Sequence, residues 1–351
     1  MMNLILKLPT PSNINYMWNF GSLLGFCLIS QILSGFFLSL YFKSDFMKSF
    51  DSVIHLMNDV NSGWMIRFIH STGASFFFIL AYFHIGKALM YSSYYYSKVW
   101  VSGLFIILFL MMEAFLGYVL PSGQMSYWGA TVITNLVSVI PYMGPCLVEW
   151  LWGGFNVGEA TLIRFFSFHF FLPFILIFFI LTHIFFLHKK GSSNPLGLSL
   201  NLDKFYFSKF FLIKDLLTLI IWSSVLLVMS FKFPFVFMDP ENFMTANPMV
   251  TPIHIQPEWY FLFAYSILRS IPSKMGGVIL LVLSILIIII LPFLKMYKMK
   301  TFKFHPLKKM AFYFHIGTFM VLTWLGMQPV EHPFVMTGKI YSFFYFIYYL
   351  L

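Results

Sequence analysis

The sequence contains little cysteine and little charge. Its two cysteines, Cys27 and Cys146, cannot form a disulfide framework. The absence of a Cys-x-x-Cys-His motif and of any cysteine cluster excludes covalently attached haem and iron–sulfur centres. Charged residues make up 10% of the 351 residues, against roughly 25% in a soluble domain, and 60% of the residues are hydrophobic. The composition therefore predicts a polytopic membrane protein without a soluble domain.

The net charge of +10 would suggest a nucleic-acid partner in a soluble protein. In an apolar chain, an excess of lysine and arginine is typical of loops that stay on the inner side of a membrane. We therefore predict no nucleic-acid partner. No cleavable signal or arginine-rich transit peptide precedes the first apolar run, so we expect that run to direct insertion itself or the chain to be inserted where it is made.

We predict an all-α fold with eight transmembrane helices, since one span needs about 20 apolar residues. The spans are expected at 19–42, 64–91, 100–120, 164–187, 216–235, 276–295, 310–328 and 336–351, the last being short. The segment 127–155 is broken by proline and glycine, and we expect two amphipathic surface helices there. Residues 1–200 would form a four-helix bundle, and residues 201–351 a second, four-span region.

The distribution of charge predicts the orientation. If both termini lie inside, the inner loops carry 14 of the 22 basic residues and two of the 12 acids, whereas the outer segments carry eight basic residues and nine acids. The remaining acid, Glu113, falls inside the third span. This bias places both termini inside and the loops after odd-numbered spans outside.

Two pairs of histidines stand in the second and fourth spans. His70 and His84 are 14 residues apart, as are His169 and His183, so each pair lies on one helix face about 21 Å apart. The two spans run in the same direction, so His70 is level with His169 near the outer face and His84 with His183 near the inner face. Histidine in a membrane is usually functional. This geometry predicts two non-covalent haems, each held by two histidines, rather than four histidines bonded to carbonyl groups.

Glycine repeats with the same period support this prediction. Gly21 and Gly35 in the first span, and Gly103 and Gly117 in the third, are again 14 residues apart. Glycine allows a flat ring to approach the backbone, although small residues also pack helices together in membranes. Arg67 and Lys87 lie one turn from His70 and His84 and are candidates for haem propionates, the alternative being membrane-edge positions with their charges in water.

The longest outer loop, 236–273, is rich in proline, and we expect it to be irregular and stiff. It contains Pro257-Glu258-Trp259-Tyr260 directly before an apolar stretch. A carboxylate between aromatic residues at the membrane edge should have a raised proton affinity and could accept a proton from a phenolic substrate. The alternative is an acid that only favours a helix N-terminus.

Taken together, these motifs resemble one family. The histidine and glycine pairs, Gly117-Tyr118-Val119-Leu120-Pro121, the segment Trp128 to Ile133, and the Glu258 motif are similar to mitochondrial cytochrome b, the core subunit of quinol:cytochrome c oxidoreductase (complex III). The resemblance covers nearly the whole chain. Two positions depart from it: Ser122 follows Pro121 where tryptophan is usual, and Lys87 stands where many relatives have arginine.

The resemblance implies two quinone sites and further contacts with the haems. Trp100 would join the cofactor-binding residues. The outer site, for quinol oxidation, would use Phe115, Tyr118, Gly129, Ile133, Pro257, Glu258 and Tyr265. The inner site, for quinone reduction, would use Trp18, Asn19, Ser22, His188, Ser192, Lys214 and Asp215. Glu258, Asp215 and His188 would carry protons.

The implied function is electron transfer across the membrane from quinol, through the outer and inner haems, to quinone at the inner site. The implied partners are an iron–sulfur protein, a cytochrome c1-type subunit, ubiquinone, the bilayer and a second copy of the complex. We expect the mitochondrial inner membrane with both termini in the matrix, or else a bacterial plasma membrane. Two rivals are a different two-haem reductase, which would not need the Glu258 loop, and a transporter or proton channel, which would lack a haem spectrum.

Overall fold

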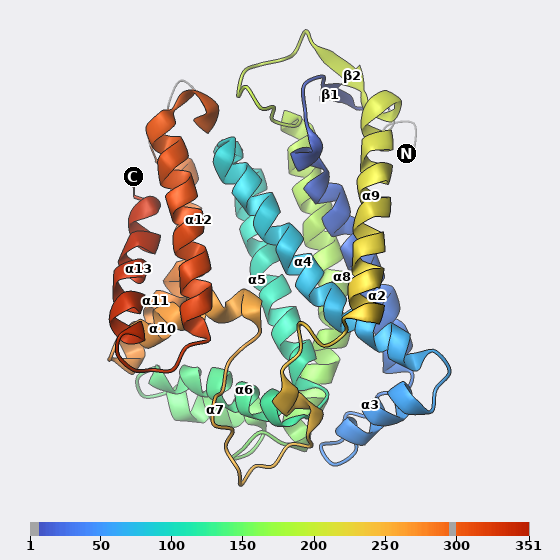
Figure 1. Cartoon of the computed structure of the whole chain (residues 1–351), viewed down its shortest axis with the longest axis vertical. Coiled ribbons are helices and arrows are strands. Elements are labelled where there is room, and N and C mark those ends of the chain that lie inside the picture. The colour runs from blue at the N-terminus through green and yellow to red at the C-terminus, as the bar shows by residue number, and fades with distance from the viewer. Residues whose placement is uncertain (1–6, 295–299, 351) are drawn as a thin grey trace.

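The computed structural model describes residues 7–294 and 300–350 and is built mostly of helices (Figure 1). The α-helices are α2 (Phe20–Ser39), α3 (Ser49–Asn58), α4 (Gly63–Met90), α5 (Ser97–Val119), α6 (Gln124–Thr134), α7 (Gly144–Trp152), α8 (Glu159–Lys190), α9 (Phe207–Lys232), α10 (Leu262–Ser270), α11 (Lys274–Leu286), α12 (Pro306–Gly326) and α13 (Phe334–Tyr348). The 3-10 helices are η1 (Tyr16–Asn19), η2 (Ser93–Tyr95), η3 (Asn135–Val139), η4 (Pro240–Phe243), η5 (Trp259–Phe261), η6 (Ile287–Phe293) and η7 (Phe302–Phe304). Two short strands, β1 (Pro9–Pro11) and β2 (Lys204–Tyr206), pair antiparallel. The predicted all-α class is confirmed.

Six helices of the described part are long and apolar enough to cross a membrane. They are Tyr16–Ser39, Gly63–Met90, Ser97–Val119, Glu159–Lys190, Phe210–Lys232 and Lys274–Phe293. Their exposed side chains are largely apolar, as a lipid-facing surface requires; examples are Phe170, Phe174 and Phe178 on α8 and Ile213 and Ile220 on α9.

The predicted seventh and eighth spans form α12 and α13, which are not among these six. The first turn of α12 carries Lys308 and Lys309. α13 has 15 residues, so its length of about 22 Å is less than the ~30 Å of a hydrocarbon core. The number of spans therefore stays a prediction, and Lys295, Lys298 and Leu351, which the predicted inner segments include, lie outside the described residues.

The first four long helices form a bundle in which α2 packs on α4 and α5 packs on α8. α9 also packs on α4 and α2, although the sequence had placed it in the second region. The remaining helices, α10 to α13, pack mainly on one another. The connections that follow odd-numbered spans, with α3, α6 and α7, lie at one end of the molecule, and β1 and β2 lie at the other (Figure 1). α6 and α7 are the predicted pair of surface helices.

Three segments differ from the expected secondary structure. The loop expected to be irregular contains α10, because the 14 residues between Pro257 and Pro272 include no proline. The sixth span narrows to the 3-10 helix η6 over four consecutive isoleucines and Pro292, which crowd and interrupt an α-helix. α9 begins nine residues before the predicted span, since charged residues limit an apolar window but not a helix.

Candidate functional site

The four histidines of the spans form two facing pairs. α4 carries His70 and His84, and α8 carries His169 and His183. The ring centroids of His70 and His169 are 6.1 Å apart, and those of His84 and His183 are 6.5 Å apart. The two parallel helices therefore bring together the partners that the 14-residue spacing predicts.

The second ring nitrogen of three of these histidines is already engaged. His70 Nδ1 lies 2.9 Å from Ser34 Oγ, and His183 Nδ1 lies 2.9 Å from Ser102 Oγ. His169 Nδ1 lies 3.0 Å from the backbone oxygen of Glu113 and 2.7 Å from its carboxylate. Such contacts fix the orientation of an imidazole and leave Nε2 as its metal-binding atom.

Each of the four periodic glycines lies against one histidine of the neighbouring helix. A Cβ atom on Gly117 would stand 2.5 Å from the His169 ring, on Gly35 3.0 Å from His70, on Gly103 3.2 Å from His183, and on Gly21 3.5 Å from His84. The helices of each packed pair are antiparallel, so both glycine repeats meet both histidine repeats. The glycines are thus needed where imidazole rings approach the backbone of α2 and α5.

A cavity of about 700 Å³ opens between the outer histidines and the outer loop. Its wall includes both imidazoles of the outer pair, Gly35, Gly117 and Arg67, and also Tyr118 and Glu258. The cavity is bordered by apolar side chains such as Phe78 and Leu110. The outer histidine pair and the carboxyl group of Glu258 therefore face one continuous space.

Glu258 is held in place by the residues that follow it. Trp259 donates its indole NH to Ser75 Oγ on α4 at 3.1 Å. Tyr260 stacks on Phe78 with 4.0 Å between ring centroids, and its carbonyl accepts a hydrogen bond from Tyr82. The aromatic residues of the motif thus anchor the loop to α4.

Burial, and next the neighbouring Asp239 carboxylate, raise the pKa of Glu258 to about 8. A hydrogen bond from Tyr118 and the positive charge of Arg67 oppose this rise. A carboxyl group with this proton affinity exchanges protons near neutral pH, as general acid–base chemistry requires. The expectation of a raised proton affinity for Glu258 agrees with this environment.

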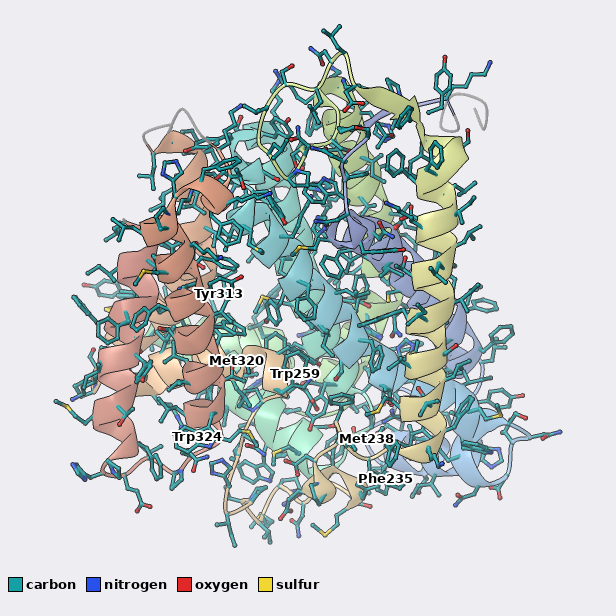
Figure 2. The ribbon with its side chains drawn as sticks, turned by 45° about the horizontal axis from the view of Figure 1, so that its top comes forward. Phe235, Met238, Trp259, Tyr313, Met320 and Trp324 are labelled. Atoms are coloured by element: carbon teal, nitrogen blue, oxygen red, sulfur yellow. The ribbon has the colours of Figure 1, made fainter. Side chains whose placement is uncertain are left out.

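The other residues of the predicted outer site surround the cavity without lining it. The residues concerned are Phe115, Gly129, Ile133, Pro257 and Tyr265. Gly129 has open space at its Cβ position, and Tyr265 donates its hydroxyl to the Ile255 carbonyl at 3.2 Å. Figure 2 shows Trp259 between α12, which carries Met320, and the segment after α9, which carries Met238. Tyr118 and Glu258 are therefore the members of the predicted set that the cavity brings together with the outer histidines.

The predicted inner site is only partly assembled. Asn19 donates to Thr218 at 3.1 Å, Ser22 donates to the Asn19 carbonyl at 2.8 Å, and Ser22 also hydrogen-bonds Asp215. Lys214 reaches the Ile14 carbonyl at 3.5 Å. His188, in the last turn of α8, and Ser192 make no side-chain hydrogen bond within the described residues. The structure thus joins α2 to α9 here and leaves these two residues apart from the group.

The remaining predicted cofactor contacts have other partners in the chain. The Lys87 ammonium lies 4.2 Å from the ring centroid of Trp18, which in turn packs on Tyr91. Trp100 donates its indole NH to the Ile288 carbonyl at 2.7 Å and so ties α5 to η6. Contacts of Lys87 and Trp100 with a haem stay predictions.

Comparison with known proteins places this architecture. The family model described as "Cytochrome b/b6/petB" matches residues 5–191, and "Cytochrome b(C-terminal)/b6/petD" matches residues 245–346. The chain belongs to the cytochrome b family. A chain of a solved structure titled "Hyperthermophilic respiratory Complex III" is 32% identical, with a TM-score of 0.93 over 99% of this chain and 93% of that one. The family implies binding of b-type haem.

The two histidine pairs of this cytochrome b fit such a group. Metal–imidazole bonds are about 2 Å long, and each ring centre lies roughly 1 Å beyond its nitrogen, so two ligands of one iron should have centroids about 6 Å apart. The observed separations of 6.1 and 6.5 Å agree with this value. A haem would bring its own ring nitrogens, so two protein ligands per iron suffice.

Several residues near these sites were not predicted from the sequence. Asp239 and Asn242 line the cavity, and Ser34, Ser102 and Glu113 contact the histidines. Ser34 and Ser102 directly precede Gly35 and Gly103, a repeated Ser-Gly signal that the sequence does contain. Asp239 gives no such signal, since its place depends on how the long loop folds back.

Proposed function

We propose that this chain is the membrane redox subunit of a quinol:cytochrome c oxidoreductase and carries electrons across the membrane through two non-covalent b-type haems. His70 and His169 would hold the outer haem, and His84 and His183 the inner haem. The proposal is supported most by the two stacked histidine pairs at haem spacing, of which the outer one opens into the cavity that contains Glu258. The cytochrome b family and the likeness to a respiratory complex III support electron transfer in quinol oxidation.

With two axial histidines, each haem supplies one-electron transfer and has no open position for oxygen or substrate. At the outer site, Tyr118 and the aromatic residues around Glu258 would orient the quinol, and Glu258 would accept one of its protons. Asp239 and Arg67, which act on the charge of Glu258, would help pass that proton outward.

At the inner site, we propose that Asn19, Ser22, Lys214 and Asp215, with Trp18, His188 and Ser192, bind quinone and deliver protons to it. Hydrogen bonds already place Ser22 and Asp215 together. Each electron that crosses between the two levels moves charge through the bilayer, which corresponds to about 2.3 kcal/mol per 100 mV. Quinol oxidation outside and quinone reduction inside would together build a proton gradient (a Q cycle).

The second electron of the quinol would leave through a partner, because this chain has two cysteines and no cluster to hold an iron–sulfur centre. The proposed partners are an iron–sulfur protein and a cytochrome c1-type subunit in a homodimeric complex. The proposed location is the mitochondrial inner membrane with both termini in the matrix, on the basis of the charge bias and the composition. A bacterial plasma membrane is the alternative.

The test is a reduced-minus-oxidised optical spectrum of the purified complex, with haem counted per chain as its pyridine haemochrome. We expect two b-type haems per chain, titrating at separate potentials. A folded, membrane-inserted chain without haem would overturn the proposal and would favour a proton path through the histidines.

A further inference from the structure

Glu113 is an acid inside a transmembrane helix. It lies in the outer half of α5, and its side chain is 12% exposed. A carboxylate in the apolar part of a membrane is costly and needs a compensating partner. None of the functional roles described above uses Glu113.

The partner of Glu113 is an outer haem ligand. One carboxylate oxygen lies 2.7 Å from His169 Nδ1, and the backbone oxygen of the same residue lies 3.0 Å from that nitrogen. The second carboxylate oxygen is buried without a hydrogen-bond partner among the described residues. The carboxylate therefore has His169 as its principal polar contact.

The other engaged histidines have neutral partners. Ser34 serves His70 and Ser102 serves His183, each through a hydroxyl group at 2.9 Å. Of these three contacts, the one to His169 alone involves a carboxylate. The described contacts thus set the outer haem apart from the inner one.

We propose that Glu113 is a positioning residue that holds the Nδ1–H of His169 and lowers the reduction potential of the outer haem relative to the inner haem. This inference rests on the proposed haem ligation. A carboxylate that accepts the Nδ1–H makes the imidazole a stronger donor to the metal, and its negative charge favours the oxidised iron. Electron transfer from the outer to the inner haem is then downhill.

The test uses redox titrations of both haems in the purified complex, with electron paramagnetic resonance of the oxidised low-spin haems. In E113Q, which keeps the size and a neutral acceptor, the outer haem potential should rise while the inner potential stays constant. The expected change is at least tenfold in the oxidised-to-reduced ratio at fixed ambient potential, which is 59 mV for one electron. The g-values of the outer haem should shift as well.

Two variants serve as controls. E113D keeps the charge, so its outer haem potential should lie closer to that of the parent than the E113Q potential does. S102A removes the neutral partner of His183 and should leave the outer potential unchanged.

An unchanged outer potential in an E113Q complex with both haems would overturn the inference and leave the proposed function intact. Loss of the outer haem in E113Q would also overturn it, because tuning alone does not require the charge for binding. If E113Q does not fold, E113D decides: a potential raised as far as tenfold would contradict the role of charge, and a parent-like potential would support it. A parent complex without haem would instead defeat the proposed function.

Discussion

At the residue scale, the chemistry depends on a few buried polar side chains whose partners are known. The four histidines face one another in two pairs, and three of them have a fixed Nδ1 contact. Glu258 is buried beside Asp239, Tyr118 and Arg67. Because these groups lie in two separate environments, substitutions should affect the haems and the proton chemistry independently.

The first prediction concerns the pairing of the histidines. H70A and H169A should each lose the same outer haem, and H84A and H183A the same inner haem, because one imidazole cannot complete the coordination. The haem count per chain should fall from two to one, with the surviving haem identified by its potential. H188A is a matched control, since His188 lies on α8 outside both pairs, and it should keep two haems. Loss of a common haem in H70A and H84A would contradict the pairing.

The second prediction concerns Glu258 and pH. Because the folded protein raises the pKa of this carboxyl group to about 8, the group is protonated at lower pH and becomes a proton acceptor as the pH rises through 8. The kcat/KM for quinol oxidation should therefore increase over this range. E258Q should remove this dependence and reduce kcat/KM by about 10- to 100-fold, with Asp239 left as a weaker acceptor. An unchanged pH profile in E258Q, with both haems present, would exclude Glu258 as the acceptor.

At the element scale, the antiparallel packing of α2 on α4 and of α5 on α8 places glycine repeats against histidine repeats. Where the glycine is closest, an added methyl group must displace the ring or the helix. Where a glycine lies in open space, alanine should favour the helix by about 1 kcal/mol.

The third prediction compares glycines on these helices. G117A should lose much of the outer haem, because its Cβ would stand 2.5 Å from the His169 ring. G21A should be mild, since 3.5 Å is an ordinary contact, and G25A on α2 should be neutral or slightly stabilising because nothing lies within 4 Å. Haem content and thermal unfolding of the purified variants measure both effects. Equal haem loss in G25A and G117A would show that the glycines act through helix packing alone.

Much of this arrangement could be predicted from periodicity. A spacing of 14 residues places side chains on one helix face, so the histidine levels follow from the sequence once the directions of the two spans are known. The long loop could not be predicted in this way, because the cavity depends on contacts distant in sequence, such as Trp259 with Ser75 and the charge of Asp239 on Glu258. The contact of Glu113 with His169 also needs the packing of α5 on α8, which no single helix pattern contains.

At the scale of the whole molecule, the outer connections with α3, α6 and α7 share one end (Figure 1). The charge bias assigns that end to the outside. The two cysteines allow this assignment to be tested without any mutation, since Cys146 on α7 is exposed and Cys27 on α2 is buried.

The fourth prediction uses a membrane-impermeant thiol reagent on sealed membranes of both orientations. Cys146 should be labelled only when the outer face is accessible, whereas Cys27 should stay unlabelled until the protein is unfolded. C146S removes the signal and identifies the site. Labelling of Cys146 from the inner face would reverse the orientation and place the Glu258 cavity on the inner side.

The pairing of β1 with β2 has a consequence for synthesis. Pro9–Pro11 pairs with Lys204–Tyr206, and Ser12 Oγ donates to the Asp203 carboxylate at 2.6 Å. A ribosome makes the first of these segments long before the second, and four helices of the bundle lie between them in the sequence. The early segment must therefore wait, unpaired and on its own side of the bilayer, until the last of those helices has been inserted. Completion of this small sheet would mark the moment at which the nascent chain has all four walls for its cofactors.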